Sequence, residues 1–241
     1  MVLCHDEIYL LASYVLFSRG SLGISHVVVY HDPANGFMTY FSKSKGNSPV
    51  ATSLTMPHLS QTQLDQLNDQ MREIRLDLGV RENSKILLLL SIATDDMIRQ
   101  VAMHPHVWFV DVTAGVNKQK KDWFIMAIRT PAGKTFPGNL TVIPSGRRWV
   151  FSTIYQFAFV QLYGELTCSR NRLVLSDEDN CQYGPFEDAI ATNDVFKNSA
   201  LMICIFHGIW MSFKEKVFKY LPHKDDGSKE LTDDGLNYGK P

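Results

Sequence analysis

The second half of this chain alternates short apolar runs with amphipathic stretches, and their order limits the folds that it can form. The run from His106 to Val112 predicts a strand. Two further strands, from Asp122 to Arg129 and from Phe136 to Ile143, flank a Pro-Ala-Gly-Lys turn and predict a hairpin. An apolar stripe at helical spacing then predicts a long helix from about Arg147 to Tyr163, capped by Ser145.

After this helix, the predicted elements alternate between strand and helix. A strand from Arg172 to Ser176 precedes a helix near Pro185 to Ala191, and a strand from Leu201 to Phe206 precedes a helix from Ile209 to Tyr220. Three strands, helix, strand, helix, strand and helix is the ribonuclease H-like order, in which the first strand is central and pairs with the fourth. We therefore expect an α/β protein with a ribonuclease H-like mixed sheet: a three-stranded meander, then alternating helix and strand.

The N-terminal part of the chain, up to Thr55, predicts a hairpin followed by a loop. Strand-like runs from Ser25 to Tyr30 and from Phe37 to Phe41 are joined by a turn sequence from His31 to Gly36. The stretch from Ser42 to Thr55 is rich in Ser, Lys, Gly and Pro, which indicates a mobile loop or linker. We expect an N-terminal region of hairpin and helix ahead of the ribonuclease H-like domain.

Capping residues mark the helices of the next segment. Ser60 is a good N-cap for a helix from about Gln61 to Leu78, and Gly79 is its stop. Thr94 opens a second helix, whereas the run from Ile86 to Ile92 could be a strand or a buried helix. The expected regions are an N-terminal hairpin and helix region, a helical segment, the ribonuclease H-like domain and a flexible tail, at residues 1–58, 59–105, 106–222 and 223–241.

Composition and charge are those of an ordinary soluble protein with an uneven charge distribution. Hydrophobic residues make up 45% of the chain and charged residues 20%, and four irregularly spaced cysteines predict thiols in a reducing compartment. No apolar stretch reaches the roughly 20 residues that a membrane span needs. Residues 106–176 carry nine Lys or Arg against three acids, and residues 177–194 carry six acids and no base. A basic surface beside an acidic pocket suits phosphate and metal, although solvated charge explains the pattern equally well.

Two carboxylates stand where the first and fourth strands are predicted to end. Asp111 ends one apolar run and Asp177 ends the other. Because these strands pair in the expected fold, their side chains should come together, and two such carboxylates can hold Mg²⁺ for phosphoryl transfer. The alternative is that Asp111 caps a turn with Thr113 and that Asp177 opens an Asx turn. Glu178 and Asp179 follow directly and are expected to lie on the loop.

A weaker metal signal lies at the end of the last predicted strand. Cys204 and His207 form a C-x-x-H pattern, which supplies two of the four ligands of a tetrahedral zinc site. A buried cysteine beside a histidine at a strand exit explains the same pattern. P-loop, nucleophile-elbow and dinucleotide patterns are absent from the sequence.

Four motifs follow one another from the first predicted strand to the last predicted helix. They are Phe109-Val110-Asp111-Val112-Thr113 with Asn117-Lys118, the helix containing Trp149, Leu175-Ser176-Asp177 with Ala189-Ile190, and Cys204-Ile205-Phe206-His207. Together they resemble the Mutator-like (MULE) transposase domain over roughly residues 107–220. The resemblance implies a nuclear cut-and-paste DNA transposase with a D-D-E triad and Mg²⁺ or Mn²⁺, acting on transposon ends, and it allows a homo-oligomer.

Carried onto this chain, the triad has two clear members. Asp111 matches the first Asp and Asp177 the second, whereas the family's Glu lies well beyond the C-x-x-H helix, and this sequence stops at Pro241, soon after His207. Glu215 is the candidate third acid, and Glu230 is the only Glu beyond Pro222. We expect an incomplete triad. The competing functions are a catalytically dead DNA-binding or regulatory protein and a ribonuclease H-like nuclease.

Three lysines follow the first predicted strand. Lys118, Lys120 and Lys121 lie on the turn that leaves the strand carrying Asp111. A loop at this place can bring their ammonium groups beside a DNA backbone, so we expect them to contact phosphate.

Overall fold

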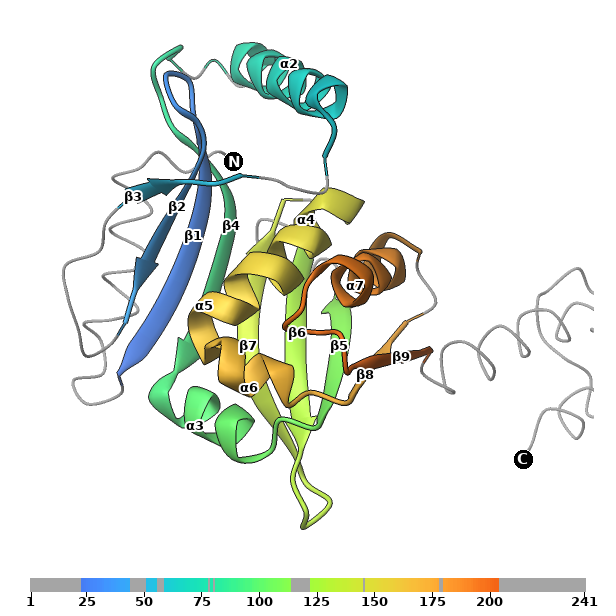
Figure 1. Cartoon of the computed structure of the whole chain (residues 1–241). Helices are drawn as coiled ribbons and strands as arrows, with labels where there is room; N and C mark the ends of the chain where they lie inside the picture. The colour runs from blue at the N-terminus through green and yellow to red at the C-terminus, as the bar shows by residue number, and fades with distance from the viewer. Residues whose placement is uncertain are drawn as a thin grey trace, which may run out of the picture.

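A single nine-stranded sheet runs through the protein in the order β3-β2-β1-β4-β7-β6-β5-β8-β9. In the computed structural model of the chain, helices α4 to α7 lie over one face of this sheet (Figure 1). The fold is therefore a mixed α/β arrangement with a large, mostly antiparallel open sheet. The structure describes residues 23–43, 51–55, 59–77, 79, 81–113, 122–144, 146–177 and 180–203.

The N-terminal strands form an antiparallel half of the sheet. β1 (Ile24–Asp32) and β2 (Gly36–Ser42) make the predicted hairpin, in which Val28 pairs with Tyr40. β4 (Ile86–Thr94) pairs with β1, so the run for which sequence left two alternatives is a strand. The expected loop over residues 51–53 is wrong, because these residues form β3 (Ala51–Ser53) on the edge of β2. A polar three-residue edge strand has no apolar alternation from which sequence can detect it.

The C-terminal strands form the mixed half. β5 (Val107–Thr113), β6 (Asp122–Arg129) and β7 (Thr135–Ile143) are an antiparallel meander. β8 (Leu173–Ser176) pairs in parallel with β5, and β9 (Ala200–Ile203) pairs in parallel with β8. The expected pairing of the first strand of this region with the fourth is therefore present.

The two halves meet along a short contact between β4 and β7. Three residue pairs join these strands, with Ser91 opposite Thr141 at the centre. The Asn139 amide donates to the Ser91 and Thr141 hydroxyls at 2.8 and 2.9 Å, and the Thr141 hydroxyl donates to that of Ser91 at 2.8 Å. All three side chains are fully buried. Side-chain hydrogen bonds thus reinforce the joint where the backbone ladder is short.

The predicted long helix is continuous but changes its pitch. α4 (Arg148–Thr153) leads into a π-helical turn (Ile154–Ala158) and then α5 (Phe159–Tyr163). The expected end at Gly164 is confirmed, because this glycine has a φ of 80°. The N-cap position is held by Arg147 without a side-chain cap hydrogen bond, and the expected cap Ser145 lies outside the described residues.

Two of the remaining helices begin where capping predicts, a third was not predicted, and the fourth begins at Asn180, five residues before the expected start near Pro185. α2 (Gln61–Asp77) begins after Ser60, whose hydroxyl accepts from the Gln63 N–H at 3.3 Å. α3 (Asp95–Met103) begins after Thr94, whose hydroxyl accepts from the Met97 N–H at 3.2 Å. The other two are α6 (Glu165–Ser169) and α7 (Asn180–Thr192). Among the helices that the structure describes, none combines the length and hydrophobicity that crossing a bilayer requires.

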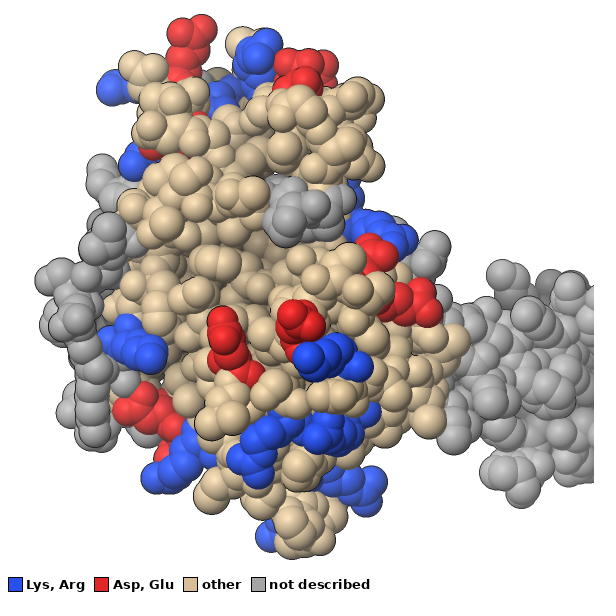
Figure 2. Space-filling model, in the orientation of Figure 1, with Lys and Arg blue, Asp and Glu red and all other residues tan. Residues whose placement is uncertain are grey.

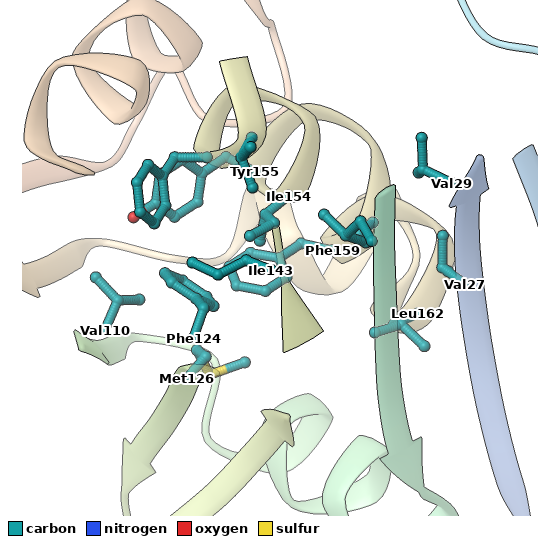
Figure 3. Close-up of a cluster of buried hydrophobic side chains, with 14 of the residues drawn as sticks. Val27, Val29, Val110, Phe124, Met126, Ile143, Ile154, Tyr155, Phe159 and Leu162 are labelled. Atoms are coloured by element: carbon teal, nitrogen blue, oxygen red, sulfur yellow. The ribbon is translucent and has the colours of Figure 1, made fainter. Parts of the chain in front are cut away.

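One main core fills the space between the sheet and the helix from Arg148 to Tyr163 (Figure 3). Trp108 of β5 is fully buried there, and its ring meets Phe159 edge-on with the centroids 5.4 Å apart. Phe124 of β6 packs against Tyr155 in the same way, at 5.9 Å. Aromatic pairs in this geometry add to the free energy gained by burying their area, so this layer fixes how the helices sit on β5 and β6.

Candidate functional site

The two predicted aspartates lie at the carboxyl ends of neighbouring parallel strands. The ladder between β5 and β8 pairs Val107 with Leu173 and Phe109 with Leu175, so the register between the two strands is constant. Asp111 and Asp177 are related by the same register, because each stands two positions beyond the pair of Phe109 and Leu175. The pairing itself ends at Phe109 and Leu175, and both aspartates follow it at the same end of the sheet.

The side chains of the two strands alternate between the covered and the uncovered face. On β5, Trp108 and Val110 are buried under the helices and Asp111 is exposed. On β8, Ser176 is buried, and its hydroxyl donates to the Gln182 side chain of α7 at 3.0 Å. Asp177 lies one residue beyond the end of β8 and is half-buried.

The local contact of Asp111 differs from the expected cap alternative. Asp111 lies inside β5, and its Oδ1 accepts a hydrogen bond from the Val112 N–H at 2.8 Å. Thr113 is still part of the strand, so Asp111 does not begin a turn there. The position leaves the exposed carboxylate at the strand end, where a ligand can approach it.

The other predicted site residues lie outside the described residues. They are Lys118, Lys120, Lys121, Glu178, Asp179, Cys204, His207 and Glu215. Their roles stay predictions. Within the described ranges, no three His, Cys, Asp or Glu side chains are grouped closely enough to hold a metal ion.

Sequence reasoning missed a polar connection between α2, α4 and α7. Arg148 of α4 forms an ion pair with Asp188 of α7 at 2.7 Å. Arg147 donates to the Gln70 side chain of α2 at 2.5 Å. A Cβ at Gly184 would lie 2.7 Å from the Arg148 Nη1, so glycine leaves room for this guanidinium. The adjacent arginines before the helix were the available signal, but their partners are far away in sequence.

The opposite end of β5 and β8 carries a different charge. Four exposed cations there form no ion pair within the described residues; we call them the basic end: Arg129, Lys134, Arg170 and Arg172. Lys and Arg side chains gather over this lower part of the molecule in Figure 2. The end with Asp111 and Asp177, which we call the carboxylate end, also carries Asp122 at the start of β6. Acidic and basic side chains are thus separated along these strands.

Comparison with known proteins gives no match. No protein-family model matches the chain, and no curated protein matches it. The strand order, the register of the two aspartates and the distribution of charge therefore carry what can be inferred about function.

Proposed function

We propose that residues 106–222 form a ribonuclease H-like catalytic domain of the Mutator-like transposase type, which transfers phosphoryl groups at DNA ends with Mg²⁺ or Mn²⁺. The strand order β7-β6-β5-β8-β9 supports this proposal, because it is a meander followed by two strands parallel to the central one. The motif resemblance over residues 107–220 points to the same class.

The observation that carries the proposal is the register between Asp111 and Asp177. Two carboxylates at neighbouring strand ends are a fitting donor set for Mg²⁺, which is held in enzymes by one or two carboxylates together with substrate phosphates and water. When bound, the ion supplies charge stabilisation at the phosphate. Asp111 and Asp177 would hold it.

Titration calorimetry with Mg²⁺ tests this site. We expect the full chain to bind the ion, and Asp111→Asn and Asp177→Asn each to abolish the heat signal while the melting temperature holds or rises, because one of two repelling carboxylates is removed. Asp194→Asn is the matched control, since Asp194 is exposed and pairs with Lys197. Equal Mg²⁺ binding by the wild type and both site variants would refute the metal site, and unfolding of Asp111→Asn would make that residue structural.

A second candidate function is a DNA-binding regulatory protein that does not cleave. The basic end favours it, because four cations that have no acidic partner among the described residues suffice to bind a phosphate backbone. An assay of labelled DNA ends with Mg²⁺ or Mn²⁺ separates the candidates. Strand transfer indicates a transposase, hydrolysis without strand transfer indicates a nuclease, and metal-independent binding without any cleavage indicates the regulatory protein.

A further inference from the structure

A groove with apolar and polar walls lies between α2 and the start of α4. It encloses about 330 Å³ and is lined by Leu59, Gln63, Gln66, Leu67, Gln70, Arg147, Arg148, Trp149 and Asp188. This volume is at the lower end of the range for small-molecule sites, so the groove has room for a group of roughly nucleotide size. Its walls come from three segments that only the tertiary structure brings together.

The groove presents hydrogen-bond donors. The Gln63 Oε1 accepts from the Ser60 N–H at 2.8 Å, and the Gln70 Oε1 accepts from Arg147 at 2.5 Å. Because both partners can only donate, the orientation of each amide is settled by chemistry. Each glutamine has thus committed its oxygen within the protein, and its NH₂ group is the part left for a ligand.

The charge of the groove is positive. Arg148 is neutralised by Asp188, whereas Arg147 is exposed and hydrogen-bonded to the neutral Gln70, with no ion pair within the described residues. Trp149 lines the groove too, and its indole N–H is buried without an acceptor in the described part of the chain. A donor-rich groove with one uncompensated guanidinium suits the oxygens of a phosphate group.

One wall of the groove, the start of α4, follows the end of β7. Ile143, the last residue of β7, pairs with Asp122, and the neighbouring Trp123 pairs with Thr113 of β5. Arg147 follows soon after Ile143 in the chain. Figure 1 shows the start of α4 above the carboxyl end of β5.

We propose that this groove is a phosphate-binding subsite that holds the backbone of a DNA strand bound by this protein. The proposal deepens the function above and rests on it for the identity of the strand. The phosphate chemistry of the groove stands on its own residues. Arg147 supplies the charge, and Gln63 and Gln70 supply oriented N–H donors.

Fluorescence anisotropy with a labelled single-stranded oligo(dT), in EDTA, tests the subsite on the full chain. We expect Arg147→Gln to weaken binding roughly tenfold and to lower the log-log salt slope by about 0.7, the value for one charge on a single strand. Arg147→Lys should recover part of the affinity, because it keeps the charge. Arg72→Gln on the exposed side of α2 is the control for net charge, and it should stay within about twofold of the wild type.

Competition by inorganic phosphate and the Asp111→Asn variant separate the remaining outcomes. If inorganic phosphate displaces oligo(dT) from the wild type but not from Arg147→Gln, the result supports phosphate binding in the groove. Equal losses in Arg147→Gln and Arg72→Gln, or no binding by the wild type, overturn it. Asp194→Asn, which is outside both sites, should bind oligo(dT) as the wild type does in EDTA. If Asp111→Asn keeps full Mg²⁺ binding while Arg147→Gln still loses the oligonucleotide, the metal site fails and the subsite stands.

Discussion

The carboxylate end and the basic end of the sheet share one hydrophobic core but carry opposite charge. At one end, Asp111 and Asp177 leave neighbouring strands in register, and at the other the same strands carry four exposed cations that have no acidic partner in the described part of the chain. The aspartates lie four to five residues along the strands from the level of Arg129 and Arg172, or about 13–17 Å at the usual rise per residue, which is more than one Debye length at physiological salt. Salt therefore screens much of the attraction between these cations and the aspartates.

Under the proposed function, this separation would keep the cations that bind a DNA backbone away from the carboxylates that hold the metal ion. A cation next to a metal-binding carboxylate would pair with it and weaken its hold on the ion, whereas a cation at the far end can still bind a long polyanion. The same core positions both ends, because β5 and β8 run from one to the other. Variants in the core can therefore show whether both ends depend on the shared hydrophobic core. Variants at each end can show whether the two ends bind their ligands independently.

The largest expected effect comes from a substitution in the shared hydrophobic core. Trp108→Ala should lower the free energy of unfolding by about 3–5 kcal/mol, because it removes a fully buried ring from contacts with Phe159 and Phe196. Both ends should lose their function together, as judged by urea unfolding and by binding assays. Leu166→Ala is the control, since Leu166 is 77% exposed and should cost little. A small loss in Trp108→Ala would contradict a shared core.

Neutralising the basic end should change DNA binding alone. The variant with Arg129, Lys134, Arg170 and Arg172 all replaced by Gln should bind duplex DNA roughly a hundredfold more weakly and lose up to about 3.6 in log-log salt slope, at about 0.9 per charge. Filter binding over a salt series measures this. Its Mg²⁺ titration should match the wild type, and a changed Mg²⁺ affinity would show that the ends are coupled.

Two glycines allow a matched comparison of packing at the ends. A Cβ at Gly138 on β7 would lie 2.5 Å from the Met126 Cε and 3.0 Å from Val101, both in the core. Gly138→Ala should therefore cost about 1–3 kcal/mol in thermal or urea unfolding. Gly184→Ala meets only the flexible end of Arg148 and should cost less, while displacing the ion pair with Asp188. The reverse order would mean that the α4–α7 contact is the more rigid one.

The smallest expected effect is a loss of stability in acid at the end where α2 attaches. Arg75 can only donate, so the His31 Nδ1 accepts from it at 3.1 Å, and the Nε2–H donates to Asn68 at 3.0 Å. Burial, more than the nearby Arg75 charge, lowers the pKa of His31 below its usual 6.5, against the opposing effects of Asn68 and Asp32. The unfolded chain then binds the proton more readily, so stability is present above about pH 6.5 and falls as the pH drops below it.

Hydrogen exchange of α2 between about pH 7.5 and 5.5, corrected for intrinsic rates, measures this effect. His31→Gln should flatten the pH dependence of hydrogen exchange in α2. Burial also lowers the pKa of His26 in β1. A His26→Gln variant therefore measures how much of the pH dependence of global stability comes from this second histidine. An α2 that is equally protected at both pH values in the wild type would rule out His31 as the cause.

Local patterns in the sequence were enough for most elements and for the places where they begin. The Ser60 and Thr94 caps, the end at Gly164 and the hairpin between β1 and β2 depend on neighbouring residues alone, so they could be predicted. Strand β6 matched its predicted bounds for the same reason. β3 and the π-helical turn could not be predicted, because pairing with β2 and packing against the core decide them.

For the candidate site, the sequence by itself placed Asp111 and Asp177 at strand ends, because an apolar run followed by an acid is a local pattern. Only the tertiary structure decided that their strands are parallel neighbours and that Asp111 is exposed, since strand pairing depends on contacts between segments far apart in the chain. The groove is the clearest case. Gln63, Gln70 and Arg147 acquire a common role only when α2 packs beside α4, and no pattern within either segment encodes that contact.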